Sequence, residues 1–381
     1  MGEILFLAHR LPYPPDRGDR IRSWHVLQAL AKIAPVHVAA LIDDEADRVH
    51  VAKVASIAAS VSIELRQTSK LRAMALALAR GTPASVEAFR SRALKAKVDA
   101  ILAGRPIDCI YAFSSQMAAY VPTGFEGQFV MDFVDMDSAK FAQMGGLANR
   151  QEARRLLTWE IAAAKRADLS LFVSQAEAAL FVDRTRLPAT VLGNGIDLAR
   201  FDPAQVIASL KTGPLIVFTG QMDYSPNVEA VVDFARHALP EILRAVPDVK
   251  FAIVGRAPVE QVWKLANKSV IVTGEVADTR PWLAAADVVV APLKLARGVQ
   301  NKVLEAMAMG RAVVASRAAA LGIAAVDGRD LIVADEPATL VIELLRDRRR
   351  SEALGLSARK LMIDRYSWDA QMAPLAGMIV R

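Results

Sequence analysis

The sequence is poor in cysteine and in long apolar runs, and both deficits exclude classes of protein. Of 381 residues only Cys109 is a cysteine, so no disulfide can form within the chain, which fits a reducing cytoplasm. Cys109 lies in the apolar run Ile107–Phe113, so we predict a buried and inert thiol. No run of about 18 uncharged apolar residues occurs, which argues against a membrane-spanning helix. The segment Met1–Arg10 lacks a basic leader and reads as the start of a strand, so we expect no signal peptide.

Several binding motifs are missing as well. No strand-like segment is followed by the G-x-G-x-x-G pattern of dinucleotide-binding enzymes, which argues against a nicotinamide dehydrogenase. No cluster of His, Cys and Asp has the spacing of metal ligands, and we interpret Asp43–Glu45 as a solvated loop, so we expect neither a metal nor a cofactor. The net charge of +6 favours anionic partners. Basic and aromatic residues do not gather on one face, however, so we expect no nucleic-acid partner.

What the sequence does contain is an alternation of short apolar strands with helical segments. Its apolar content of 53% and charged content of 23% are those of a globular protein, and its length suffices for two domains. The expected strands are Ile4–Ala8, Val36–Leu41, Ile63–Leu65, Cys109–Phe113, Phe129–Phe133 and Leu169–Val173, followed by Leu215–Thr219, Lys250–Val254, Val270–Thr273, Val288–Ala291 and Ala312–Ala315. Helices are expected between them, for example at Arg20–Ile33 and Asn149–Arg166. The pattern predicts an α/β protein with two Rossmann-like, doubly wound domains that face each other across a cleft.

Turn-forming residues mark the boundary between these domains. Asn194-Gly195 and Phe201-Asp202-Pro203 are typical of turns and linkers. We therefore assign residues 1–197 to a first domain and residues 213–361 to a second. Apolar residues recur at helical spacing near the end of the chain, so residues 362–381 are expected to form a C-terminal helix that could pack back on either domain, and we favour the first.

The stretch Ala296–Arg311 has the pattern of a helix that begins at a ligand site. Gly298 allows a tight turn after the preceding strand, and Gln300 or Asn301 could cap the helix. The helix has an apolar stripe and a glycine suited to a left-handed end: Val303, Leu304, Met307, Ala308 and then Gly310. The N–H groups of its first turn and Lys302 could hold a phosphate, and Glu305 could accept hydrogen bonds from ribose hydroxyls. The alternative is a surface lysine with a glutamate that merely favours the helix dipole.

Residues 69–97 are basic and carry an apolar stripe. Glu87 is the only acid among seven basic residues there: Lys70, Arg72, Arg80, Arg90, Arg92, Lys95 and Lys97. Such a segment could lie on an anionic membrane surface. The alternative is a solvated helix of the first domain.

Several motifs, in their serial order, resemble the family 4 glycosyltransferases. They are Leu192–Asp197 with Phe201, Phe251–Gly255, Val272–Val276 and Lys302–Val314. This family has the GT-B fold, in which the C-terminal domain binds a nucleotide-sugar donor and the N-terminal domain binds the acceptor. Three further segments resemble a subgroup of sugar transferases associated with bacterial exopolysaccharide clusters (the PEP-CTERM/exosortase-associated transferases): Arg10–Pro15, Phe133–Ser138 and Gly220–Asn227.

The resemblance implies roles for particular residues. Glu305 would hold the donor ribose, and Lys302 would face the diphosphate together with nearby backbone amides. Arg256 would contact the base or the phosphates, and Gly18 would let the N-terminal loop approach the donor phosphate or the acceptor. The donor-binding set expected on this basis is Gly18, Arg256, Arg297, Gly298, Asn301, Lys302, Val303, Leu304 and Glu305.

The sequence departs from the family at three places. Arg297 stands where the family usually has a glutamate that contacts the donor sugar, so it could accommodate the phosphates or an acidic sugar such as a uronic acid. Gln221 and Asn227 replace the usual arginine and lysine. The family histidine of the first domain has no clear match, and Ser114 stands at the strand end where it would be expected. Ser114 or Ser115 could contact the sugar, or either could simply be a polar residue at the end of a strand.

Carboxylates near the strand Phe129–Phe133 are the best candidates for work on the acceptor. Our hypothesis is that Asp135 polarises or orients the acceptor hydroxyl and thus acts as a catalytic residue beside Lys302 and Glu305. The alternative is that Asp135 forms a turn and Asp137 caps a helix. The remaining acceptor-binding candidates are Asp16, Arg17, Asp19 and Arg22 in and after the first loop, with Asp137 and Ser114, although the charges of the loop could simply be solvated.

The sequence therefore predicts a metal-independent, hexosyltransferase-like glycosyltransferase. It would move a sugar from a nucleoside-diphosphate sugar to a glycan or lipid-linked acceptor in bacterial exopolysaccharide or cell-surface polysaccharide synthesis, with the retention of configuration that the resemblance implies. Two alternatives stay open: a nucleotide-sugar epimerase of the same fold, or a catalytically impaired module that binds sugar nucleotides. The expected location is cytoplasmic, peripheral on the inner face of the plasma membrane if residues 69–97 bind it.

Overall fold

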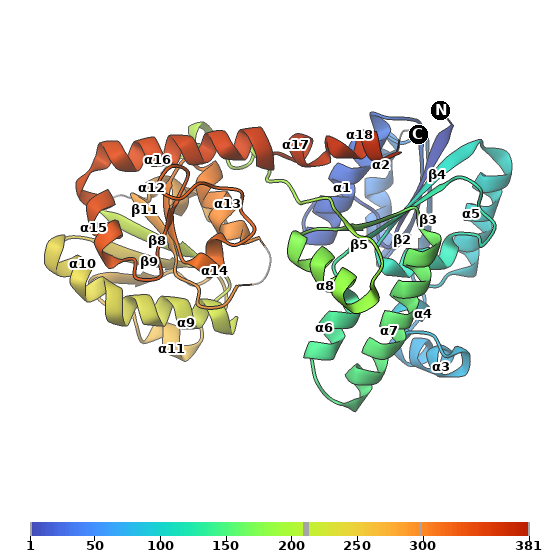
Figure 1. Cartoon of the computed structure of the whole chain (residues 1–381), viewed down its shortest axis with the longest axis horizontal. Coiled ribbons are helices and arrows are strands. Elements are labelled where there is room, and N and C mark those ends of the chain that lie inside the picture. The colour runs from blue at the N-terminus through green and yellow to red at the C-terminus, as the bar shows by residue number, and fades with distance from the viewer. Residues whose placement is uncertain (1, 209–212, 297–298, 380–381) are drawn as a thin grey trace. The chain divides into compact units, whose positions relative to one another are not determined.

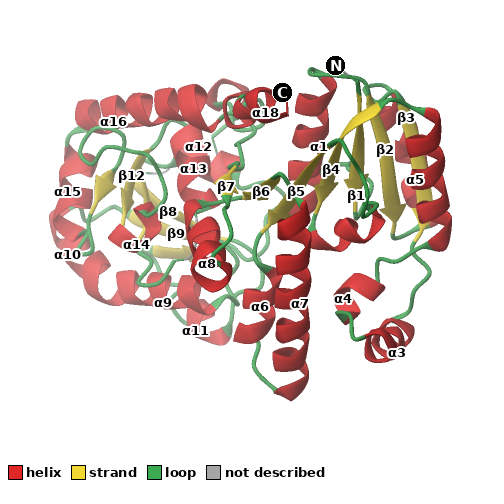
Figure 2. Ribbon diagram, turned by 45° about the vertical axis from the view of Figure 1, so that its right-hand side comes forward, coloured by secondary structure: helices red, strands yellow, loops and turns green. Residues whose placement is uncertain are grey.

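The computed structural model describes residues 2–208, 213–296 and 299–379. The chain forms two compact units: the first comprises Met1–Asn194 and Gln371–Arg381, and the second comprises Gly195–Ala370. Each unit contains one parallel sheet surrounded by helices (Figures 1 and 2). The predicted α/β class with two Rossmann-like domains is confirmed.

The sheet of the first unit is doubly wound. Its strand order is β3-β2-β1-β4-β5-β6-β7, and all neighbouring strands are parallel. The strands are β1 Glu3–Ala8, β2 Val36–Ile42, β3 Ser60–Leu65, β4 Ile107–Phe113, β5 Gln128–Val134, β6 Leu169–Phe172 and β7 Thr190–Val191. The chain moves outward from β1 to β3 and then crosses back to place β4 beside β1. Ligands of such sheets bind at the carboxyl ends of the strands next to this switch point.

Helices cover both faces of this sheet, which explains why its central strands are apolar throughout. Leu5 and Leu7 of β1 pack into the core that α5 Arg92–Gly104, α7 Leu147–Arg166 and α8 Gln175–Thr185 also line. Helix α1 Gly18–Ala31 lies on the face opposite α5 (Figure 1). Cys109 is buried in β4, as predicted, and burial raises the pKa of its thiol to about 12.

Shorter helices complete the first unit. They are α2 Val51–Ala55, α3 Lys70–Arg80, α4 Ala84–Glu87, α6 Asp137–Gln143 and α18 Pro374–Ile379, with 3-10 turns at Glu45–His50 and Ser115–Tyr120. The end of the chain belongs to this unit, because α18 contacts α1 and the backbone oxygen of Met378 accepts a hydrogen bond from Gln128. In the part of the chain that the structure describes, no helix is both long and apolar enough to cross a bilayer.

The second unit repeats the same topology. Its strand order is β10-β9-β8-β11-β12-β13, with a switch point between β8 and β11. The strands are β8 Leu215–Thr219, β9 Lys250–Val254, β10 Val270–Val272, β11 Val288–Ala291, β12 Ala312–Ala315 and β13 Ile332–Val333. The helices are α9 Ser225–Asp233, α10 Leu239–Ala245, α11 Glu260–Trp263, α12 Arg280–Ala285, α13 Asn301–Ala308, α14 Arg317–Ala320, α15 Ala338–Arg346 and α16 Arg348–Leu361. A 3-10 turn lies at Pro203–Gln205, π-helical turns lie at Phe234–Ala238 and Met362–Tyr366, and α17 Trp368–Met372 leads into the tail of the first unit.

Candidate functional site

A cavity of about 550 Å³ lies at the carboxyl ends of the second unit's strands. Its walls include Thr219, Gly220 and Gln221 at the end of β8, Gly255 and Arg256 after β9, Asn227 of α9, and Gln300, Asn301, Lys302 and Glu305 at the start of α13. Since α13 follows β11, the cavity sits at the switch point of the sheet, where ligands of doubly wound proteins bind.

Helix α13 begins directly at this cavity. The sequence predicted that Gln300 or Asn301 caps this helix. Gln300 occupies the cap position, but its side chain accepts no hydrogen bond from the first turn. Val303 and Leu304 are buried in the core, and their backbone N–H groups donate to the backbone oxygen of Gln300, so the structure gives neither residue the predicted contact with a ligand. Gly310 has a φ of 64°, as its predicted left-handed position requires. The N–H groups of the first turn that precede Val303 can donate to an anion in the cavity.

The ammonium group of Lys302 lies within the cavity and is held by neutral groups. Its Nζ donates a hydrogen bond to Oδ1 of Asn227 and lies 4.3 Å from the centre of the Phe218 ring. Burial lowers the pKa of Lys302 to about 8, although the nearby charge of Glu305 acts in the opposite direction. The group therefore keeps its charge at neutral pH while its surroundings solvate that charge poorly, which favours an anionic ligand.

Glu305 lies one turn further along α13. Burial raises the pKa of its carboxyl to about 7, against the opposing effects of Arg200 and Lys302. A carboxyl group that is only partly ionised near neutral pH can both donate and accept hydrogen bonds. Such a group suits sugar hydroxyls, which do the same.

Two amide side chains connect the cations of the cavity. Oε1 of Gln221 accepts a hydrogen bond of 2.8 Å from Nη2 of Arg256. Nδ2 of Asn227 donates to the backbone oxygen of Gln221 at 2.9 Å, while its Oδ1 accepts from Lys302. Gln221 and Asn227, which stand where the resemblance expects cations, thus orient Arg256 and Lys302.

The floor of the cavity requires glycine. A Cβ atom on Gly255, whose φ is 152°, would lie 1.7 Å from the backbone oxygen of Gly220, and a Cβ on Gly220 would lie 3.1 Å from Nζ of Lys302. The chains at the ends of β8 and β9 can approach each other only because neither residue carries a side chain. Beside them, Oγ1 of Thr219 is buried and has no hydrogen-bond partner among the described residues.

The donor-binding residues predicted from the sequence are brought together in part. Arg256, Asn301, Lys302 and Glu305 line one cavity. Arg297 and Gly298 lie outside the described residues. Gly18 begins α1 of the first unit, and the position that a Cβ would occupy there is open.

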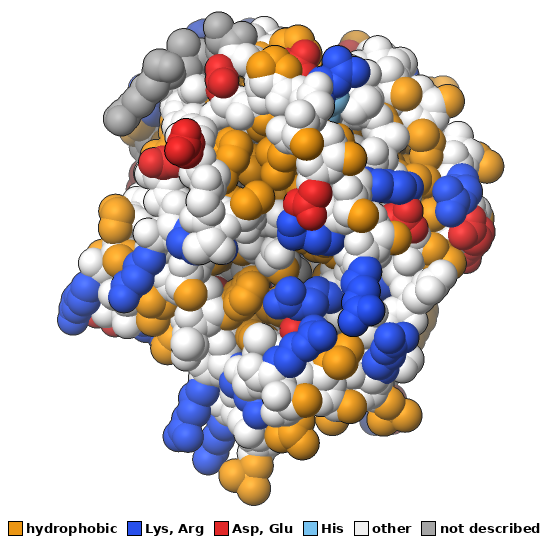
Figure 3. Space-filling view, turned by 90° about the vertical axis from the view of Figure 1, so that its right-hand side faces the viewer, with side chains coloured by type: hydrophobic (Ala, Val, Ile, Leu, Met, Phe, Trp, Pro, Cys, Tyr) orange, Lys and Arg blue, Asp and Glu red, His pale blue; other side chains and the backbone are white. Residues whose placement is uncertain are grey.

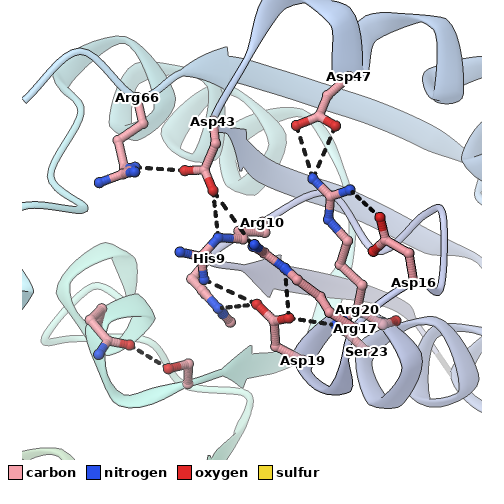
Figure 4. Close-up of polar contacts among 12 residues, drawn as sticks. His9, Arg10, Asp16, Arg17, Asp19, Arg20, Ser23, Asp43, Asp47 and Arg66 are labelled. Atoms are coloured by element: carbon pink, nitrogen blue, oxygen red, sulfur yellow. Dashed lines mark hydrogen bonds and ion pairs between the residues drawn. The ribbon is translucent and has the colours of Figure 1, made fainter. Parts of the chain in front are cut away.

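In the first unit, charged side chains meet at the carboxyl ends of β1 and β2 (Figure 4). Arg10 donates to Asp43 at 2.6 Å and to Asp19 at 3.0 Å, and Arg66 donates to Asp43 at 2.7 Å. The carboxylate of Asp19 also lies 3.2 Å from Nε2 of His9. Burial alone would raise the pKa of Asp19, but the hydrogen bond to His9 and the charges of His9, Arg17 and Arg10 lower it well below its usual range.

The predicted acceptor residues of the first loop belong to this ionic network. Arg17 pairs with Asp19 at 2.9 Å, and Asp16 lies 3.6 Å from Arg20. The side chains of Asp16 and Arg17 are about half exposed, whereas that of Asp19 is enclosed by its partners. Asp16 and Arg17 can therefore reach a ligand, while Asp19 fixes the arrangement of the loop.

Arg22 corrects one of the predictions. Its guanidinium group is fully buried and forms an ion pair of 3.0 Å with Asp132, which is also fully buried. Further donors of the same group bond Oδ1 of Asn194 at 2.9 Å and the backbone oxygen of Gly193 at 3.3 Å. These partners occupy the guanidinium group inside the first unit, so Arg22 is a structural residue and does not contact an acceptor.

Asp135 and Asp137 lie close together in the sequence but differ in environment. The carboxylate of Asp135 pairs with the exposed Lys140 at 2.7 Å. That of Asp137 accepts long hydrogen bonds from Gln116 at 3.3 Å and Ser115 at 3.4 Å, and burial raises its pKa, whereas the charge of Lys140 opposes this shift. Because a carboxylate with a raised pKa is a stronger base, Asp137 is a second candidate, besides Asp135, for the action on the acceptor hydroxyl.

Strained backbone surrounds Asp137. Ser114, which follows β4, has a φ angle of 77°, and Val134, which ends β5, has a φ angle of 68°. A left-handed conformation is costly for a β-branched residue such as Val134 and is found mainly where function demands it. Ser114 hydrogen-bonds Gln116, one of the donors to Asp137, so it contributes to the site through Gln116.

His9 is the residue of this region that the sequence pattern did not single out. Its ring stacks on Phe113 with a centroid distance of 5.8 Å, and its charge acts on Asp137 as well as on Asp19. His9 directly follows β1, and Ser114 directly follows β4, so both stand at the switch point of the first sheet. The sequence could have indicated His9, because it is a polar residue directly after the first strand, where ligands of parallel sheets bind.

Comparisons with known proteins agree with this geometry. Residues 213–347 match the family described as "Glycosyl transferases group 1". The chain is 29% identical over 287 residues to a GDP-mannose-dependent alpha-(1-6)-phosphatidylinositol monomannoside mannosyltransferase of Mycolicibacterium smegmatis, over 64% of this chain and 74% of that protein.

Solved structures share the fold over almost the whole chain. HepE of Anabaena in complex with UDP superposes with a TM-score of 0.66 at 18% identity, covering 99% of both chains. Sucrose-phosphate synthase of Thermosynechococcus elongatus gives a TM-score of 0.64 at 17% identity, covering 99% of this chain and 98% of that one. The chain thus has the GT-B fold, and residues 213–347 of its second unit are similar to the glycosyl transferases group 1 family.

Proposed function

We propose that this protein is a glycosyltransferase that moves a sugar from a nucleoside-diphosphate sugar to a glycan or lipid-linked acceptor. The observation that carries the proposal is the cavity at the switch point of the second unit, where Lys302 and Glu305 project from the first two turns of α13. The group 1 family match covers this domain. HepE was solved with UDP, and the mycobacterial relative is GDP-mannose-dependent, which supports a nucleotide donor.

The chemistry follows from the charges of the cavity. Transfer leaves negative charge on the departing diphosphate, and Lys302, Arg256 and the N–H groups of α13 supply positive charge where that charge develops. Glu305 would hold ribose hydroxyls and so fix the donor. With these groups in place the proposed reaction requires no metal or cofactor. Retention of configuration and a role in bacterial exopolysaccharide synthesis are parts of the proposal that rest on the family resemblance.

A screen of nucleotide sugars by thermal unfolding tests the donor assignment. A ligand at 100 times its Kd stabilises the folded state by about 2.7 kcal/mol, which should raise the melting temperature by about 5 °C. We expect a shift with UDP-glucose or GDP-mannose and a smaller one with the free sugars. If no nucleoside diphosphate or nucleotide sugar shifts the transition, the proposal is wrong. Incubation of the bound donor without acceptor separates transfer from epimerisation, because only an epimerase would isomerise the donor sugar under these conditions.

Asp137 is the carboxylate that we expect to act on the acceptor hydroxyl. Replacement by asparagine removes the proton acceptor but keeps the shape of the side chain, so turnover should fall about 100-fold while donor affinity stays unchanged. Asp135→Asn, which removes the nearer of two carboxylate partners of the exposed Lys140, should change turnover less than tenfold. Steady-state kinetics of both variants decide between them, and the reverse order of effects would restore Asp135 as the catalytic residue.

We further propose that the protein acts at an anionic membrane surface. Helix α3 packs inward through Ala73 and Ala77 and leaves its larger apolar residues outside, with Leu71 81% and Leu78 72% exposed. Leu147, the first residue of α7 after the turn that follows α6, is 85% exposed. Figures 1 and 2 show α3 and this turn at the same end of the first unit.

The charge at this end of the first unit is basic. Glu87, the only acid of residues 69–97, is buried under Arg80 and Arg90, with which it pairs at 2.7 and 2.8 Å. Figure 3 shows the molecule from the side that lies at the right in Figure 1. Lys and Arg side chains gather on the lower half of this view, and apolar side chains lie at its lower end. Exposed apolar side chains beside basic ones are typical of proteins that rest on anionic lipid, which would also bring the enzyme to a lipid-linked acceptor.

Vesicle sedimentation tests the membrane assignment. Leu78→Glu should lower binding to phosphatidylglycerol-containing vesicles about tenfold, because a charge replaces an inserting side chain. Leu356→Glu is the matched control, since Leu356 of the second unit is 71% exposed and lies on α16. Equal losses in the two variants, or no binding of the wild-type protein, would contradict the assignment.

A further inference from the structure

The cations of the donor cavity are positioned by neutral groups. Among the described residues, no carboxylate lies within ion-pair distance of Lys302 or Arg256, and each of these cations is hydrogen-bonded to a side-chain amide oxygen. An amide oxygen fixes the direction of a cation without cancelling its charge, whereas a carboxylate would do both.

The two amides form one connected unit. Asn227 is buried, donates to the backbone of Gln221 and accepts from Lys302, while the side chain of Gln221 accepts from Arg256. A shift of Asn227 would therefore displace Lys302 directly and Arg256 through the backbone at Gln221. The absence of side chains at Gly220 and Gly255 leaves the space in which this chain of contacts lies.

We propose that Gln221 and Asn227 are positioning residues that hold Arg256 and Lys302 by neutral oxygens, so that both cations keep their full charge for the diphosphate of the donor. The inference rests on the proposed function of this cavity. It also explains how the site can bind a diphosphate although Gln221 and Asn227 replace the arginine and lysine that are usual in the family 4 glycosyltransferases. Two preset cations match the two negative charges of a nucleoside diphosphate that is bound to a sugar.

The substitution Asn227→Asp tests this inference, because it keeps the shape of the side chain, adds a negative charge beside Lys302 and removes the donor to the backbone oxygen of Gln221. The new carboxylate should form an ion pair with Lys302, which stabilises the fold but competes with the ligand's phosphates. We expect a melting temperature close to that of the wild-type protein, because the new ion pair offsets the lost hydrogen bond to Gln221. The affinity for UDP or GDP, measured by titration calorimetry at pH 7, should fall by at least tenfold. Asn267→Asp is the control for net charge, since Asn267 lies in an exposed turn of the same unit.

The pH profile gives a second readout that a merely structural role would not move. An anion binds the protonated form of Lys302, so the affinity of the wild-type protein should fall as the pH rises through the pKa of about 8. In Asn227→Asp the carboxylate holds the proton on Lys302, so this fall should move to higher pH. Gln221→Glu should likewise weaken binding through Arg256.

The outcomes separate this inference from the proposed function. If the wild-type protein binds no nucleoside diphosphate, UDP and GDP included, the proposed function itself fails. If the wild-type protein binds one of them and Asn227→Asp binds it equally well with the same pH profile, the positioning role is wrong while the donor site stands. A loss of affinity in Asn267→Asp as large as in Asn227→Asp would also overturn the inference, because it would show a general effect of charge.

Discussion

Replacing Lys302 by alanine is expected to lower the affinity for a nucleoside-diphosphate sugar about 100-fold, the equivalent of about 3 kcal/mol. The ammonium group sits in the cavity with its charge balanced by no carboxylate among the described residues, so a bound phosphate gains a charge-assisted hydrogen bond that the variant cannot supply. Turnover should fall by at least the same factor, because the charge on the phosphate increases as the sugar departs.

Titration calorimetry and steady-state kinetics measure the two effects of Lys302→Ala separately. Lys264→Ala is the control, because Lys264 belongs to the same unit but lies on the surface in a pair with Glu260. The folded state of Lys302→Ala should be retained, since removal of a poorly solvated charge costs little stability. An affinity within threefold of the wild-type value would show that the phosphates bind elsewhere.

Replacing Asp132 by alanine is expected to produce the largest loss of stability, about 3–5 kcal/mol. The substitution leaves the buried guanidinium group of Arg22 without its counter-charge, and it leaves the hydroxyl of Tyr111 without the acceptor that now lies at 2.7 Å. Burial and the charge of Asp132 raise the pKa of Tyr111 well above its usual value, so this hydroxyl stays protonated and must find an acceptor.

Calorimetry should show the effect of Asp132→Ala as a fall of roughly 10 °C in the melting temperature of the first unit. Asp99→Ala is the matched control, since Asp99 pairs with Lys95 on the surface, where ion pairs contribute less than about 1 kcal/mol. The double variant Arg22→Met/Asp132→Leu should recover part of the loss, because an apolar pair leaves no charge uncompensated, whereas the hydroxyl of Tyr111 still lacks its acceptor. A change below 1 kcal/mol in Asp132→Ala would show that Arg22 finds another partner.

The cluster at the strand ends of the first unit shows why sequence reasoning identified some site residues and misplaced others. Arg22 and Asp19 looked alike in the sequence, as charged residues near a proline-rich loop. The helical turn of α1 directs Arg22 into the interior toward Asp132, whereas Asp19 faces His9 and Arg10. The difference depends on which side of a helix meets the sheet, and the helix has little apolar periodicity that would reveal it.

The sequence alone determined the properties that depend on neighbours along the chain. Runs of apolar residues separated by helical patterns specify two doubly wound sheets, because strands covered on both faces must be apolar throughout. The apolar stripe of α13 fixes Lys302 and Glu305 relative to each other, since residues three apart share a helical face. These features were predicted with their approximate bounds, apart from the two-residue strands β7 and β13, which are too short to leave a pattern.

Only the tertiary structure decided which distant residues meet. The order of strands in each sheet places His9 beside Phe113 and within the electrostatic reach of Asp137, and it places Asn227 against Lys302. Such contacts form at the carboxyl ends of strands that are adjacent in space but not in sequence, and no local pattern encodes that adjacency. For the same reason the sequence showed Gln221 and Asn227 only as replacements of an arginine and a lysine. The folded chain shows that their amide oxygens accept hydrogen bonds from Arg256 and Lys302.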